Sequence, residues 1–230
     1  MQEPVKPLNG GIRHYWWLLL GVLSVSSAAI LIRLADADPL IIATYRMAIA
    51  TVAVAVPTVI SSRSHLGSLK RSQVSLLVIS GGFLALHFAS WISSLSLTSV
   101  GNSVFLVTTS PIFVAVGSYL YFRDHISPKL FLAILATLAG GVLLTLSDGV
   151  RDQSALLGDG LAIVGALSIA GYLLVGRSLR TSIPTLPYVT MVYGIATLFL
   201  LAGSIISGAS LAGITLETYL WMTLAALIPQ

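Results

Sequence analysis

Polar and aromatic side chains recur at helical spacing inside two long apolar runs of the sequence. In the first run His87, Trp91 and Ser94 follow one another at intervals of four and three residues, which places them on one face of an α-helix. An imidazole, an indole and a hydroxyl can bind a small polar molecule noncovalently, and the imidazole can also exchange a proton near neutral pH. This run therefore predicts one wall of a binding cavity.

The next apolar run predicts a second wall. Asn102, Phe105 and Thr109 share a helical face there, and the short connection between the two runs makes them antiparallel neighbours. Further along, Ser168 and Tyr172 lie four residues apart and could form an opposing wall. We predict that the substrate-binding residues are His87, Trp91, Asn102, Phe105, Thr109, Ser168 and Tyr172.

The same polar residues have a structural interpretation, in which they hydrogen-bond between neighbouring helices in a membrane. We favour this interpretation for the Ser and Thr side chains. For His87, Trp91 and Asn102 together we favour the cavity, because polar groups in a bilayer normally face the protein interior or water. Proton coupling through His87 and uncoupled exchange are both open.

Arg46 and Pro111 are predicted to have gating or structural roles. Arg46 lies inside an apolar run without a carboxylate to pair with, so it could extend outward to the membrane surface or bind an anionic substrate from within a cavity. Pro111 lacks a backbone N–H and its ring clashes with the carbonyl of Val107, which predicts a kink in the middle of its helix.

The composition predicts an all-α polytopic membrane protein embedded in a lipid bilayer. Hydrophobic residues make up 56% of the chain and charged residues 9%, whereas roughly 25% charged is usual in soluble domains. The chain has no cysteine, which excludes cysteine-ligated metals and thiol catalysis. Its basic residues are scattered through short loops, so no nucleic-acid partner is expected, and we expect no metal and no cofactor.

Long apolar stretches give the number and order of the expected membrane spans. They cover residues 16–32, 40–60, 74–97, 100–121, 130–146, 160–175 and 188–206, and an eighth begins near Tyr219. The eighth is much shorter than the ~20 residues needed to cross a bilayer, so we expect the chain to be a fragment of a longer protein.

The positions of Lys and Arg predict the orientation. With a cytoplasmic N-terminus, nine of the twelve basic residues lie in cytoplasmic segments, and this asymmetry is typical of membrane proteins. The nine are Lys6, Arg13, Arg63, Lys70, Arg71, Arg123, Lys129, Arg177 and Arg180. We therefore expect a multi-pass protein of the cell (inner) membrane with its N-terminus in the cytoplasm.

A short motif suggests an internal repeat. PLIIATYRMA begins at Pro39 and PYVTMVYGIA begins at Pro187, and both follow the pattern P-x5-Y-x2-A. The two copies lie in the second and seventh spans, and an offset of five spans, an odd number, would invert the second copy in the membrane, as in many transporters.

Residues 81–146 closely resemble the first repeat of the EamA-type transporters of the drug/metabolite transporter superfamily. The matching positions are Gly82, His87, Phe88, Trp91, Thr98 with Ser99, Asn102, Ser110 with Pro111, the Arg123-Asp124 turn, and Gly140 with Gly141. Many family members have Gly-Glu where this chain has Arg123 and Asp124. The resemblance implies two inverted five-helix repeats that export or exchange small organic metabolites by alternating access.

The resemblance also implies a domain organisation and a function that is not enzymatic. A cytoplasmic stub (1–15) would precede the first repeat (16–147), an extracytoplasmic linker (148–158) and an incomplete second repeat (159–230). Amino-acid-like compounds, nucleosides and drugs all fit such a cavity, and a homo-oligomer is possible.

Two other classes of function are compatible with parts of the sequence. A non-transporting membrane scaffold or a truncated inactive product is the main alternative. A membrane-embedded enzyme is less favoured, because its nearest candidate cluster, Asp148, Asp152 and Asp159, is expected in an outside loop without a histidine.

Overall fold

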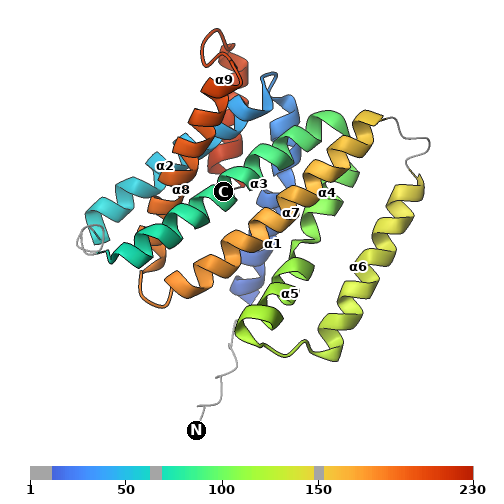
Figure 1. Cartoon of the computed structure of the whole chain (residues 1–230). Coiled ribbons are helices and arrows are strands. Elements are labelled where there is room, and N and C mark those ends of the chain that lie inside the picture. The colour runs from blue at the N-terminus through green and yellow to red at the C-terminus, as the bar shows by residue number, and fades with distance from the viewer. Residues whose placement is uncertain (1–11, 63–68, 148–152, 230) are drawn as a thin grey trace.

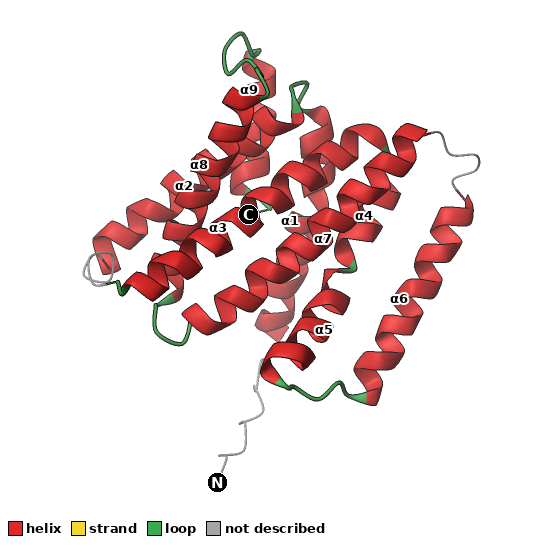
Figure 2. Ribbon diagram, viewed as in Figure 1, coloured by secondary structure: helices red, strands yellow, loops and turns green. Residues whose placement is uncertain are grey.

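The computed structural model describes residues 12–62, 69–147 and 153–229, and all regular secondary structure in these ranges is helical (Figure 2). The helices are α1 (Ile12–Leu34), α2 (Pro39–Ser62), α3 (Arg71–Leu97), α4 (Val100–Thr108), α5 (Ser110–Phe122), α6 (Pro128–Ser147), α7 (Gln153–Leu179), α8 (Thr185–Ile206) and α9 (Leu216–Leu227). Six helical segments among these residues are long and apolar enough to cross a membrane. The predicted all-α membrane bundle is confirmed.

Every predicted span overlaps a single helix except 100–121, which is divided between α4 and α5, and the boundaries move. The largest change is at α7, which begins at Gln153, so most of the predicted linker (148–158) is the first part of this helix. Residues 148–152, including Asp148 and Asp152, lie outside the described residues. Residues 1–11 of the predicted N-terminal stub also lie outside them, and α1 begins at Ile12.

The predicted kink at Pro111 is confirmed as a break between α4 and α5. Thr109 separates the two helices, and Pro111 lies in the first turn of α5, where a missing N–H costs least. Around the break, the Thr109 N–H donates to Leu106 O at 3.2 Å and the Ile112 N–H to Thr109 O at 2.9 Å. These bonds span three residues, so the chain turns more tightly here than in an α-helix.

Helices α3 and α7 lie side by side through the middle of the bundle (Figure 1). Glycines of α7 allow this close approach. A Cβ at Gly158 would lie 2.9 Å from Cβ and backbone N of Thr98, and one at Gly165 would lie 3.3 Å from Cβ of Trp91. A larger residue at either position would push α7 away from α3.

Helices α2 and α8 also pack side by side and are joined by three hydroxyl pairs spaced seven residues apart. The oxygens are 3.0 Å apart in Thr44–Ser204, 3.1 Å in Thr51–Thr197 and 2.6 Å in Thr58–Thr190. The partner numbers fall along α8 as they rise along α2, so the helices are antiparallel. These hydroxyls join the two helices.

The Thr58→Val variant should lower the free energy of unfolding by only about 0.6 kcal/mol, the average measured for hydrogen bonds between membrane helices. Valine keeps the shape, and the Thr190 hydroxyl retains its bond to Leu186 O at 3.0 Å. Unfolding of the purified protein in mixed detergent and SDS micelles measures the change. Thr137→Val is the control, because the Thr137 hydroxyl bonds Ala133 O within α6 and this bond is exposed. Equal losses in the two variants would contradict the role of the hydroxyl pairs.

Candidate functional site

Three of the predicted residues meet at a cavity of about 330 Å³ between α1, α2, α3, the α4–α5 segment and α7. Arg46, His87 and Trp91 supply its charged, imidazole and indole groups. The remaining lining residues are mostly apolar, with a few hydroxyls: Val25, Ser26, Ala28, Ala29, Phe88, Val104, Val107, Thr108, Ser110, Ile169 and Pro229.

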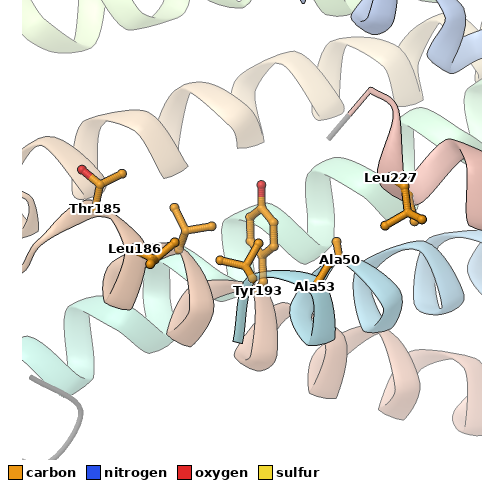
Figure 3. Close-up of a pocket in the computed structure, with 9 residues that line it drawn as sticks. Ala50, Ala53, Thr185, Leu186, Tyr193 and Leu227 are labelled. Atoms are coloured by element: carbon orange, nitrogen blue, oxygen red, sulfur yellow. The ribbon is translucent and has the colours of Figure 1, made fainter. Parts of the chain in front are cut away.

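A larger cavity of about 500 Å³ lies between α2, α8 and α9, with Ala50, Leu186, Tyr193 and Leu227 among its lining residues (Figure 3). None of its lining residues is charged, and only Thr185 and Tyr193 carry polar side-chain groups. Selective binding sites combine apolar walls with a few convergent polar groups. The smaller cavity therefore suits selective recognition of a substrate better.

Arg46 is buried in the wall of the smaller cavity, with 3% of its surface exposed. Its guanidinium lies 4.8 Å from the ring centroid of Phe88 and 5.8 Å from that of Trp91. The possibility that Arg46 extends outward to the membrane surface is therefore wrong. Carboxylates are not the only groups that hold a buried cation, and here the aromatic rings of α3 hold it through cation–π contacts.

The His87 ring is held against α7. Its Nδ1 lies 2.9 Å from the carbonyl oxygen of Gly165, and its ring stacks on Trp91 at a centroid distance of 5.8 Å. Because a carbonyl oxygen only accepts hydrogen bonds, Nδ1 carries the hydrogen in this contact. Gly165 permits the contact, since a side chain there would separate the two helices beside Trp91.

Trp91 contributes an unusual donor to the cavity wall. Its indole Nε1 is buried and has no hydrogen-bond partner among the described residues. An indole N–H can only donate, and burying it without an acceptor destabilises the folded state. Buried polar atoms without a partner are uncommon, and functional sites are one place where they occur.

The other predicted binding residues do not line this cavity. Phe105 packs at Gly141 of α6, and the Thr109 hydroxyl donates to Leu106 O at 2.6 Å. Ser168 donates to Val164 O at 2.7 Å, and Tyr172 stacks on Tyr188 at 6.2 Å.

The cavity face of α4 is rotated from the predicted one. Val104, Val107 and Thr108 line the cavity in place of Asn102, Phe105 and Thr109. One residue corresponds to about 100° of rotation, so a small error in the assigned face redirects every side chain.

Asn102 instead contacts the buried carboxylate of Asp159. The predicted position of Asp159 in an outside loop is therefore wrong as well. Asp159 lies within α7 with 9% of its surface exposed, and not in an outside loop. It accepts hydrogen bonds from the Asn102 side-chain amide and from the Thr98 hydroxyl, the latter at 2.8 Å. The carbonyl of Thr98 also accepts a bond from Arg33 of α1 at 2.9 Å. Asp159 therefore joins α7 to the turn between α3 and α4.

The opposite end of α7 is joined to the turn after α5. The guanidinium of Arg177 donates to both carboxylate oxygens of Asp124 and lies 4.3 Å from the ring centroid of Phe122. This hydrogen bonding holds the pKa of Asp124 below its ordinary value of 3.8. Asp124 and Arg177 are solvent-exposed, so salt and water screen the pair.

We expect the Asp124→Asn variant to unfold at a slightly lower temperature than the wild type at neutral pH. A carboxylate with a depressed pKa stabilises the folded state above its unfolded pKa, and the contribution disappears as the pH falls through the folded value. The difference between the proteins should therefore vanish in acid. Thermal unfolding in detergent over a pH series measures it, and a difference that persists in acid would contradict the assignment.

The model of the EamA-like transporter family matches residues 12–146, which include α1 to α5 and almost all of α6. No curated protein matches the chain. Among the described residues, no group of three or more His, Asp or Glu side chains is placed to hold a metal ion.

Proposed function

Because the chain belongs to the EamA-like transporter family, we propose that it exports or exchanges small organic molecules by alternating access, with the Arg46, His87 and Trp91 cavity as its substrate site. The family is one of membrane transporters, and the apolar helices are those of a multi-pass membrane protein. Asn102, Phe105, Thr109, Ser168 and Tyr172 then have structural roles in holding the helices around the site.

One observation carries the proposal: a guanidinium, an imidazole and an indole converge on a cavity among membrane-spanning helices. A charged side chain inside a membrane costs ~2.5–3.5 kcal/mol on insertion scales, so such residues usually mark a functional pathway. The stability of the bundle does not explain this arrangement, since apolar side chains of the same size would pack the space at lower cost.

The arrangement of α2 and α8 supports the proposed inverted repeat. These helices carry the two copies of the P-x5-Y-x2-A motif. Their hydroxyl pairs show that the two helices are antiparallel. Two copies in opposite orientations around one site would allow the site to face either side of the membrane in turn. The distribution of Lys and Arg supports a cytoplasmic N-terminus in the cell membrane.

Release from vesicles tests the proposed function without a known substrate. The purified chain is reconstituted into vesicles loaded with a desalted extract of cellular metabolites, and mass spectrometry follows the compounds that leave. We expect a subset of compounds to leave faster than from protein-free vesicles, and Trp91→Ala to abolish the difference. Leu132→Ala on exposed α6 is the control and should retain release. Equal release with and without protein would contradict transport and favour a membrane scaffold.

A further inference from the structure

The cavity combines one permanent positive charge with apolar walls. Arg46 is the only residue with a formal charge among those that line it, and a guanidinium keeps its charge even when buried. No carboxylate lines the cavity within the described part of the chain. Because charges interact strongly in a medium of low dielectric, the interior has a positive electrostatic potential.

The aromatic rings do not make the cavity suitable for a cation. Phe88 and Trp91 would otherwise attract an ammonium group, but the guanidinium of Arg46 already lies over both rings. These contacts hold the guanidinium in place without cancelling its charge. A second cation in the cavity would therefore meet repulsion from Arg46 and occupied ring faces.

A second hydrogen-bond donor, like the positive charge of Arg46, favours an anionic ligand. The indole N–H of Trp91 is buried without an acceptor among the described residues, and Trp91 lines the same cavity as Arg46. An anionic oxygen is the acceptor that both groups favour, because hydrogen bonds from N–H groups to an ionised oxygen are stronger than those to a neutral one.

The remaining walls of the cavity are mostly apolar, which favours a ligand with an apolar body. Val25, Ala28, Val104, Val107 and Ile169 present only hydrocarbon to the cavity. An apolar body gains free energy by leaving water for such a surface. Resting on the proposed function, we infer that the transported substrate is a small organic acid, with its carboxylate at Arg46 and Trp91 and an apolar body against α1, α4 and α7.

Ligand binding tests this inference separately from transport. The purified full chain in uncharged detergent is mixed with three probes of one skeleton: phenylacetate, phenylacetamide and phenethylamine. Matched sets with isobutyl and indole skeletons are tested in the same way. A ligand that binds the folded state raises the unfolding temperature in proportion to its occupancy. We expect the carboxylates to raise it, the amides to have a much smaller effect, and the amines to have none.

Variants identify the group responsible. Arg46→Gln should weaken carboxylate binding by about tenfold or more, and Trp91→Phe, which keeps a ring but removes the donor, should weaken it less. Arg46→Lys keeps the charge and should retain part of the preference. Arg71→Gln removes a charge from an exposed position and is the control for overall charge. Circular dichroism and gel-filtration elution confirm that each variant is folded.

The possible outcomes are distinct. Stabilisation by amines or amides equal to that by carboxylates would overturn the inference, as would carboxylate binding that survives in Arg46→Gln. The absence of any shift would overturn it too. Carboxylate binding without release from vesicles would support the inference on ligand class and contradict the proposed transport.

Discussion

Replacing Asp159 with alanine should lower the free energy of unfolding by about 2–4 kcal/mol. The change removes the acceptor for the Thr98 hydroxyl and the Asn102 amide, both of which are buried. A buried donor left without an acceptor costs about 1–3 kcal/mol, and two are affected here. The junction between α7 and the α3–α4 turn would lose its central polar contact.

Two further variants separate this role from a general effect of charge. Asp159→Asn keeps one acceptor oxygen and should lose about 1–2 kcal/mol. Asp36→Ala removes a carboxylate from an exposed position and should change stability by less than about 0.5 kcal/mol. Unfolding in SDS measures all three. A loss in Asp159→Ala no larger than in Asp36→Ala would show that the buried contacts contribute little.

The Gly158→Leu variant should prevent α3 and α7 from packing, and we expect most of the protein to misfold or aggregate on purification. Even a methyl group at this position would lie 2.9 Å from Cβ of Leu97 and from both Cβ and backbone N of Thr98. Backbone and Cβ atoms cannot rotate away, so the helices themselves must separate. Overpacking of this kind costs about 1–3 kcal/mol per site or more, and here it also displaces Thr98 from Asp159.

Gly160 provides a matched control two residues further along α7. A Cβ there meets no atom within 4 Å, so Gly160→Leu should fold with near wild-type stability. Both variants introduce the same side chain into the same helix, and both gain helix propensity relative to glycine. The fraction of each variant that elutes as a monodisperse peak measures the effect. Equal yields would contradict the close contact between α3 and α7.

The fold was largely predictable because the membrane spans appear in the sequence as long apolar runs. A helix that crosses lipid must satisfy its own backbone groups, so length and hydropathy alone identify it. Pro111 also located the break between α4 and α5, because its missing N–H has a direct local consequence.

The candidate site was predictable only in part. His87 and Trp91 stand on the cavity face of α3, which their spacing indicated. For α4 the same argument selected Asn102, whose polar side chain faces Asp159 instead of the cavity. Spacing shows which residues share a face, but it does not show which neighbouring helix that face meets.

The start of α7 and the partners of Arg46 depend on tertiary contacts, which the local sequence does not reveal. The polar segment before Gly158 and Asp159 predicts a loop, yet both residues form part of α7 because close packing with α3 favours the helix. The aromatic partners of Arg46 do not follow from the positions of the carboxylates in the sequence. Phe88, adjacent to His87 in the sequence, was the available signal for a cation–π contact.

Site-directed labelling tests the central claim most directly, since the chain has no native cysteine and each introduced thiol can be labelled alone. Thr108→Cys places a thiol in the cavity wall, and Ser210→Cys places one on an exposed loop away from it. Each variant in vesicles is treated with a membrane-impermeant methanethiosulfonate reagent, and release of the compounds found with the metabolite extract is measured. Our account predicts that modification of Thr108→Cys blocks release and that modification of Ser210→Cys does not. Undiminished release after complete modification of Thr108→Cys would contradict this cavity as the transport site.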